Sequence, residues 1–212
     1  MGLFRRAVEL FPYVFHPSTV LGLGILLLVH YEWDRQPVGR ASLWKRIGAF
    51  LGAGVLAFVP TAAYFLLARG SLSNALEGSS WQLDMMVAAG VYVAAGTTWY
   101  LWRRFDWGEL VPDAMVVLAA VMVPYTLASP FWDISGHVII ALAPLLFLAL
   151  LDRRYWPLLA IPVLMVPNRV MVNAHTWPQS VAGFLVAAAI TVGLFRLQAR
   201  GNPGGEVAST PS

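Results

Sequence analysis

A serine, a glycine and a histidine stand together where one long apolar run of this sequence begins. They are Ser135, Gly136 and His137. A serine hydroxyl and the free backbone N–H groups at a helix start can donate hydrogen bonds to an anion, and the helix dipole favours negative charge there. The glycine would let a ligand approach the backbone closely. Arg169 closes the next apolar run, and its planar fork of donors matches two phosphate oxygens at once. These residues predict a phosphate site.

Two histidines flank this predicted site. His175 follows Arg169 in an R-x5-H spacing, and His137 stands on the other side of the intervening apolar run. One imidazole could attack phosphorus while the other protonates the departing oxygen. Gln179 lies four residues after His175, so both side chains share one face if a helix begins here. We therefore expect Gln179 to accept a hydrogen bond from one ring nitrogen of His175, so that the other ring nitrogen of His175 faces the substrate.

The composition indicates a chain that lies in a membrane. Of its 212 residues, 58% are hydrophobic and 12% are charged, whereas about a quarter of a soluble domain is charged. The net charge is +3, and no basic stripe with interleaved aromatic residues is present, so nucleic acid is not expected as a partner. The chain has no cysteine, which excludes disulfides, thiolate metal sites and a cysteine nucleophile.

Seven apolar segments are expected to position the site residues. They run over residues 17–31, 47–68, 83–102, 111–130, 136–151, 155–170 and 176–197. Runs of about 20 apolar residues can cross a bilayer as helices. The sequence therefore predicts an all-α fold, a polytopic membrane helical bundle of about seven transmembrane helices within residues 1–199. The tail at 200–212 is rich in Gly, Pro, Ser and Thr, and we expect it to be disordered.

The basic residues predict the orientation of this bundle. Ten of the 14 lysines and arginines lie on the side that holds the loops after the first, third and fifth segments and the C-terminus. The positive-inside rule makes that side cytoplasmic. The stretches around His137, Arg169 and His175 then meet at the non-cytoplasmic face of a multi-pass cell-membrane protein. Arg5 and Arg6 run against the rule, and we expect them in the interface ahead of the first segment.

The stretch "SGH", followed by R-x5-H-x3-Q, resembles the second and third signature motifs of the type 2 phosphatidic acid phosphatase superfamily, the lipid phosphate phosphatases. The resemblance covers roughly residues 131–185. It implies a helical phosphatase that forms a phosphohistidine intermediate and needs no metal and no cofactor. It assigns His175 as the nucleophile and His137 as the general acid. The residues that it assigns to the phosphoryl oxygens are Ser135, Gly136 and Arg169.

The chain departs from the pattern of that family at three places. Ile134 replaces the usual proline before the serine, and Gln179 replaces the usual aspartate. The first motif, Lys-x6-Arg-Pro, has no counterpart, and Arg69 is the residue that we expect in place of its arginine. The glutamine spacing is similar to that of the dolichyl diphosphatase and glucose-6-phosphatase branches, which favours a polyprenyl diphosphate substrate. In lacking the first motif, the chain is similar to the sphingomyelin synthase-like branch, whose members transfer a head group.

The predicted function is therefore a membrane phosphatase whose partners are the bilayer and a lipid phosphate or diphosphate substrate. Two alternatives stay open. One is a lipid- or phosphate-binding or transport protein that has lost catalysis, and the other is a head-group phosphotransferase. The sequence leaves the oligomeric state open.

Other polar residues near the segment ends are expected to have structural roles. We expect Asp133 to cap the helix that begins at 136. Asp84 and Asp113 lie near helix ends, where structural or interfacial roles are expected. His16 precedes Pro17, and we expect it to start a helix, with a role in the site as the alternative.

Overall fold

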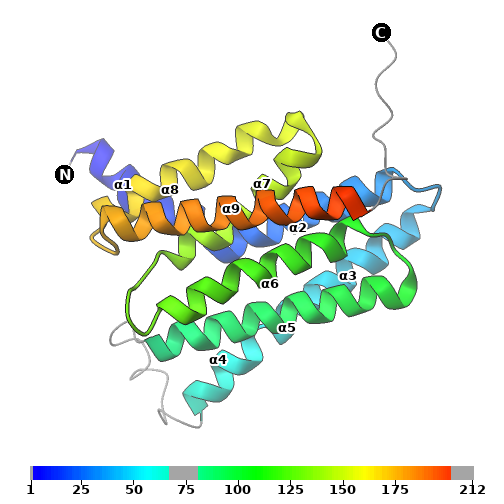
Figure 1. The fold of residues 1–212 in the computed structure, drawn as a ribbon, viewed down its shortest axis with the longest axis horizontal. Helices are drawn as coiled ribbons and strands as arrows, with labels where there is room; N and C mark the ends of the chain where they lie inside the picture. The colour runs from blue at the N-terminus through cyan, green and yellow to red at the C-terminus, as the bar shows by residue number, and fades with distance from the viewer. Residues whose placement is uncertain (1, 67–80, 202–212) are drawn as a thin grey trace.

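The computed structural model describes residues 2–66 and 81–201, and within them it contains helices and turns but no β-strand (Figure 1). The all-helical prediction is confirmed. The helices are α1 (Leu3–Val14), α2 (Pro17–Asp34), α3 (Arg40–Leu56), α4 (Phe58–Tyr64), α5 (Trp81–Phe105), α6 (Leu110–Ala128), α7 (Gly136–Leu151), the 3-10 helix η2 (Arg153–Leu159), α8 (Ala160–Met171) and α9 (Trp177–Gly201). Helix α9 continues into the predicted tail, and the rest of that tail lies outside the described residues.

Several of these helices have the length and composition of membrane spans. Three are long and apolar enough to cross a bilayer: Arg40–Tyr64, which joins α3 and α4, then α6 and α9. Helices α1 and α2 add a fourth if the pair, bent by 53° at the break between them, forms one span. Membrane-type helices are thus present among the described residues, whereas the predicted number of about seven is not confirmed.

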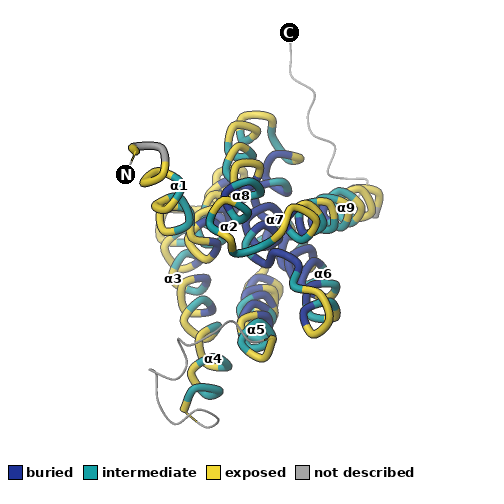
Figure 2. Tube along the Cα trace, turned by 90° about the vertical axis from the view of Figure 1, so that its left-hand side faces the viewer, coloured by how far each residue is buried: buried dark blue, intermediate teal, exposed yellow. Residues whose placement is uncertain are grey.

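Helix α7 lies at the centre of the bundle (Figure 2). Its sequence is apolar on every face beyond His137, and 12 of its 16 residues are buried. A helix that is apolar all round needs neighbours on all sides, and α2, α6, α8 and α9 pack around this one. Gly24 allows the close approach of α2, because a Cβ at this position would lie 3.1 Å from the Cβ of Pro144.

The outer helices direct apolar side chains away from the bundle. Leu51, Val55, Phe58 and Val59 on α3 and α4 are all exposed. A contiguous exposed apolar surface of this kind is rare on soluble proteins. A hydrocarbon environment would cover it without further partners.

A buried polar cluster ties α2, α5 and α6 together at the end of the bundle opposite the α8–α9 turn. Glu32 accepts hydrogen bonds from the Trp102 indole N–H at 2.8 Å and from the Leu110 backbone N–H at 2.6 Å. Arg46, one of the basic residues counted for the cytoplasmic loops, is 2% exposed. Its guanidinium donates to the Gln36 side-chain oxygen at 2.6 Å. Arg46 therefore has a structural role inside the bundle and does not act as an exposed loop charge.

Helix α1 is an element beyond the seven predicted segments. It lies against α8, where the Asn168 side chain donates to the Val8 carbonyl at 2.7 Å (Figure 1). The chain then bends, and α2 starts with His16 as its N-cap and Pro17 in its first turn. Proline suits the start of a helix because the N–H that it lacks would have no helical partner there. The expected helix-start role of His16 is confirmed.

Gly90 is the point where α5 meets the break between α3 and α4. A Cβ at this position would collide with the backbone oxygen of Ala57. We expect Gly90→Ala to lower the free energy of unfolding by about 1–3 kcal/mol, although alanine has the better helix propensity. Gly96→Ala on the same helix is the control, because no atom lies within 4 Å of its Cβ position. Thermal unfolding in detergent micelles should separate the two variants, and equal losses would contradict this packing.

Candidate active site

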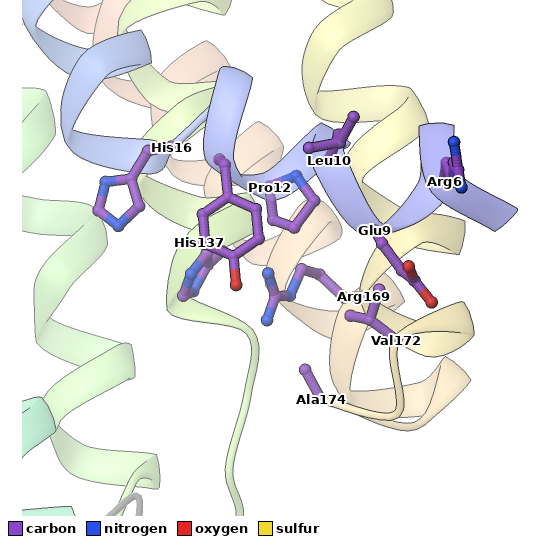
Figure 3. A pocket seen from close by; sticks show the side chains of 10 residues that line it. Arg6, Glu9, Leu10, Pro12, His16, His137, Arg169, Val172 and Ala174 are labelled. Atoms are coloured by element: carbon purple, nitrogen blue, oxygen red, sulfur yellow. The ribbon is translucent and has the colours of Figure 1, made fainter. Parts of the chain in front are cut away.

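A pocket of about 770 Å³ lies where α1, α2, α7 and α8 meet (Figure 3). His137 and Arg169, two of the predicted site residues, both line it. His16 also lines it, and the His16 and His137 ring centroids are 6.1 Å apart in an edge-to-face arrangement. The structure thus brings residues from the starts of α2 and α7 and the end of α8 to one place. His175 does not line the pocket; it lies in the turn that follows Arg169.

The turn after α8 fixes the position of His175 relative to Arg169. Asn173 has a φ of 56°, in the left-handed region that asparagine tolerates better than most residues. Its N–H donates to the Val170 carbonyl at 3.0 Å. The N–H groups of Ala174 and His175 donate to the Arg169 carbonyl at 3.0 and 3.2 Å. This is the Schellman pattern of a helix end, so the R-x5-H spacing corresponds to one helix-ending turn.

The His175 side chain is 9% exposed and faces a carboxylate. Its Nδ1 lies 3.4 Å from Oδ2 of Asp133. Burial lowers the pKa of His175; the Asp133 carboxylate opposes this shift, and the charge of Arg169 adds to it. The net lowering favours the neutral imidazole, the form in which histidine is a nucleophile. Because Nδ1 faces Asp133, Nε2 is the nitrogen left for attack.

The predicted capping role of Asp133 is wrong. Ser135 is the N-cap residue of α7, and no side chain caps this helix by a hydrogen bond. Asp133 pairs with His175 instead. Sequence reasoning missed this partner because the two residues are 42 positions apart. The available signal was the position of Asp133, two residues before the "SGH" stretch.

Gln179 has a different partner from the expected one. Its side-chain oxygen accepts hydrogen bonds from the backbone N–H and the hydroxyl of Thr176, at 2.7 and 3.0 Å. Thr-x-x-Gln at a helix start is a capping box, and α9 begins directly after Thr176. Among the described residues no hydrogen bond joins Gln179 to His175, so the position expected to orient the nucleophile caps α9.

Ser135 and Gly136 position the start of α7 and do not line the pocket. Ser135 is fully buried, and its backbone N–H donates to the Gln179 carbonyl at 3.3 Å. The Tyr125 ring occupies the space beside Gly136, where a Cβ would lie 2.8 Å from ring carbons. The Tyr125 hydroxyl in turn interacts with the Asp84 side chain. The space beside Gly136 is therefore filled by the Tyr125 ring, whereas the sequence predicted that a ligand would approach the backbone there. Arg69, the expected stand-in for the first motif, lies outside the described residues.

Three buried polar atoms of the predicted site residues make no hydrogen bond within the described part of the chain. Ser135 Oγ, Arg169 Nε and His175 Nδ1 are among the ten buried side-chain atoms without a hydrogen-bond partner within residues 2–66 and 81–201. Buried polar atoms are usually hydrogen-bonded, and each exception calls for an explanation. Of these three residues only Arg169 lines the pocket, and an unpartnered guanidinium N–H there suits an anionic ligand. In the same part of the chain, no three His, Asp or Glu side chains lie close enough together to hold a metal ion.

Removal of the Asp133 charge should lower the pKa of His175 further. Asp133→Asn keeps the side-chain shape but deletes the charge that favours the imidazolium. The chain has four histidines, so an NMR titration of their ring signals in micelles is tractable, with His175→Gln to identify the signal. Gln179→Ala should leave this pKa in place, because Gln179 bonds to Thr176. An unchanged titration in Asp133→Asn, or an equal shift in Gln179→Ala, would contradict the pairing.

The chain matches no protein-family model, no curated protein and no solved structure. The features of the chain that bear on function are therefore the two motif-like stretches and the pocket that His137 and Arg169 line, with His175 in the turn after Arg169.

Proposed function

We propose that this chain is an integral membrane phosphatase that hydrolyses a lipid phosphate or polyprenyl diphosphate through a phosphohistidine intermediate, without a metal. One observation carries the proposal. His137 and Arg169, which are far apart in the sequence, line one pocket, and His175 lies in the turn directly after Arg169, where its backbone N–H donates to the Arg169 carbonyl at 3.2 Å. Two imidazoles and a guanidinium are the groups that phosphoryl transfer through histidine needs.

The proposal includes the resemblance to the lipid phosphate phosphatases and the placement in the membrane. In it, the seven apolar segments cross the membrane of the cell, and the pocket opens on the non-cytoplasmic face. The head of the substrate lies in the pocket, and its apolar tail lies in the bilayer. Helix α1, in which Arg5, Arg6 and Glu9 are exposed, lies at the interface with the lipid head groups.

The chemistry divides between the two histidines. Nε2 of His175 attacks phosphorus in line, and the bond from phosphorus to the leaving oxygen breaks. Arg169 stabilises the charge on the equatorial oxygens. His137 donates a proton to the leaving oxygen, and the bound phosphate favours the protonated form of this neighbouring imidazole. Water then attacks the phosphohistidine, His137 takes its proton, and breakage of the P–N bond releases phosphate and restores His175.

The test is release of phosphate from farnesyl diphosphate or phosphatidate by the purified protein in micelles containing EDTA. We expect His175→Ala to lower the rate at least ~10³-fold and His137→Ala to lower it ~10²- to 10⁴-fold. His30→Ala is the control, because His30 is exposed near the opposite end of α2. Full activity in His175→Ala would reject the nucleophile. Binding without turnover by the wild-type protein would favour a binding protein, and a new lipid product without free phosphate would favour head-group transfer.

The pH dependence of kcat/KM should follow His175. Its pKa is lowered by burial and by Arg169, against the carboxylates of Asp133 and Asp84, so it lies below the ordinary value of about 6.5. The imidazolium cannot attack phosphorus. We therefore expect the rate to rise with pH through this lowered pKa, and to fall again at higher pH once His137 has lost the proton that it must donate. Asp133→Asn should move this acid limb to lower pH, and a limb that stays in place would contradict the assignment.

A further inference from the structure

His16 is a pocket residue that the mechanism above does not use. It comes from the bend between α1 and α2, far from either motif-like stretch, yet it lines the same pocket as His137 and Arg169. Figure 3 shows the His16 ring, the His137 ring and the Arg169 guanidinium following one another along the pocket. The His16 and His137 rings are 6.1 Å apart between centroids, at an interplanar angle of 71°.

The contacts of His16 distinguish its two ring nitrogens. Its Nδ1 accepts from the Ser18 backbone N–H at 3.4 Å and lies 2.6 Å from the Ser18 hydroxyl oxygen. A backbone N–H can only donate, so Nδ1 is an acceptor here. In a neutral imidazole the other nitrogen then carries the proton. Nε2 of His16 is therefore a hydrogen-bond donor available to a ligand.

The charges around His16 suit an anion. Arg169 supplies a positive charge to the pocket, and Glu9 is the one acidic residue among those that line it. The Glu9 carboxylate is engaged by Arg5 at 2.9 Å. In Figure 3 this carboxylate points away from the Arg169 guanidinium. The end of the pocket at His16 and His137 is thus lined by donors and a cation.

We propose that His16 binds the second phosphoryl group of a diphosphate substrate, so that the enzyme prefers lipid diphosphates to monophosphates. The inference rests on the proposed function. When His175 attacks the terminal phosphorus of a diphosphate ester, the bond to the bridging oxygen breaks, and that oxygen belongs to the second phosphoryl group. His137 faces this oxygen, so the neighbouring His16 lies next to the second phosphoryl group. In a monoester the leaving oxygen carries carbon, which gives His16 no anionic partner.

The atoms balance in this step. A bond forms between Nε2 of His175 and the terminal phosphorus, and the bond between that phosphorus and the bridging oxygen breaks. The electron pair leaves on the bridging oxygen, which receives the proton of His137. The product is a lipid monophosphate, and the N–H of His16 donates to one of its oxygens. Hydrolysis of the phosphohistidine then proceeds as for any other substrate.

His16→Asn tests this role without removing the helix cap. Asparagine is a strong N-cap residue, but its side chain is too short to reach the position of the imidazole Nε2. We expect kcat/KM for farnesyl diphosphate to fall about 10- to 100-fold, the effect of one hydrogen bond to a charged group. For farnesyl monophosphate, which has the same tail, it should stay within about twofold. His16→Asp is also a good N-cap, and its negative charge should give a larger loss with the diphosphate.

The controls separate this role from the others. His30→Asn, on the same helix, should change neither rate. Equal losses with both substrates in His16→Asn would overturn the proposal, because a proton relay through His137 or a disturbed fold would affect them alike. A thermal melt of each variant without substrate checks the fold.

A binding experiment keeps the inference apart from the proposed function. If the wild-type protein turned over neither substrate, the phosphatase proposal would fail. The thermal shift of that protein with inorganic pyrophosphate, compared with inorganic phosphate, would then decide about His16. A pyrophosphate shift that is lost in His16→Asn, with the phosphate shift retained, supports the second subsite. Equal shifts in the wild type and the variant reject it.

Discussion

The site depends on the close approach of the start of α7 to α9. Gly183 on α9 lies against the Ser135 backbone, and a Cβ there would be 2.9 Å from the Ser135 carbonyl oxygen. The Ser135 N–H donates to the Gln179 carbonyl across the same contact. Ser135 stands between Asp133 and His137 in the sequence. This contact therefore holds Asp133 and His137 close to the segment that contains His175. A larger residue at 183 would force these groups apart before it touched any of them.

Helix α7 is a short apolar helix, and charged side chains lie near its start. Its 16 residues extend over about 24 Å at ~1.5 Å per residue, less than the hydrocarbon thickness of about 30 Å. Its first residues are buried, and Ser135 is fully covered. Buried polar groups are costly unless they are partnered. Asp133 and His175 pair, whereas Arg169 has a buried Nε without a partner in the described chain. The group without a partner belongs to a positively charged side chain, which is the charge that the proposed anionic substrate requires.

Local features of the sequence predict much of this arrangement. The run at 136–151 coincides with α7, because an apolar stretch between polar ends is a local signal. The R-x5-H spacing is also local, since it spans one helix-ending turn at Asn173. Partners across helices are different. Asp133 and Gln179 have other partners than predicted, because facing residues are set by which helices pack together. Helix α1 went unpredicted as a segment because its charged residues interrupt the apolar pattern.

The N-cap of α2 shows how one side chain can meet two demands. Serine, threonine, aspartate and asparagine are the preferred N-cap residues, so a histidine there calls for a reason. The cap needs an acceptor, and Nδ1 of His16 supplies it to the Ser18 N–H. The pocket is lined by the same ring, and an anion would need a donor. One neutral tautomer provides both, whereas the carboxylate of an aspartate would provide only the first. The bend before Pro17 places this ring at the pocket, so the break between α1 and α2 is part of the site as well as of the fold.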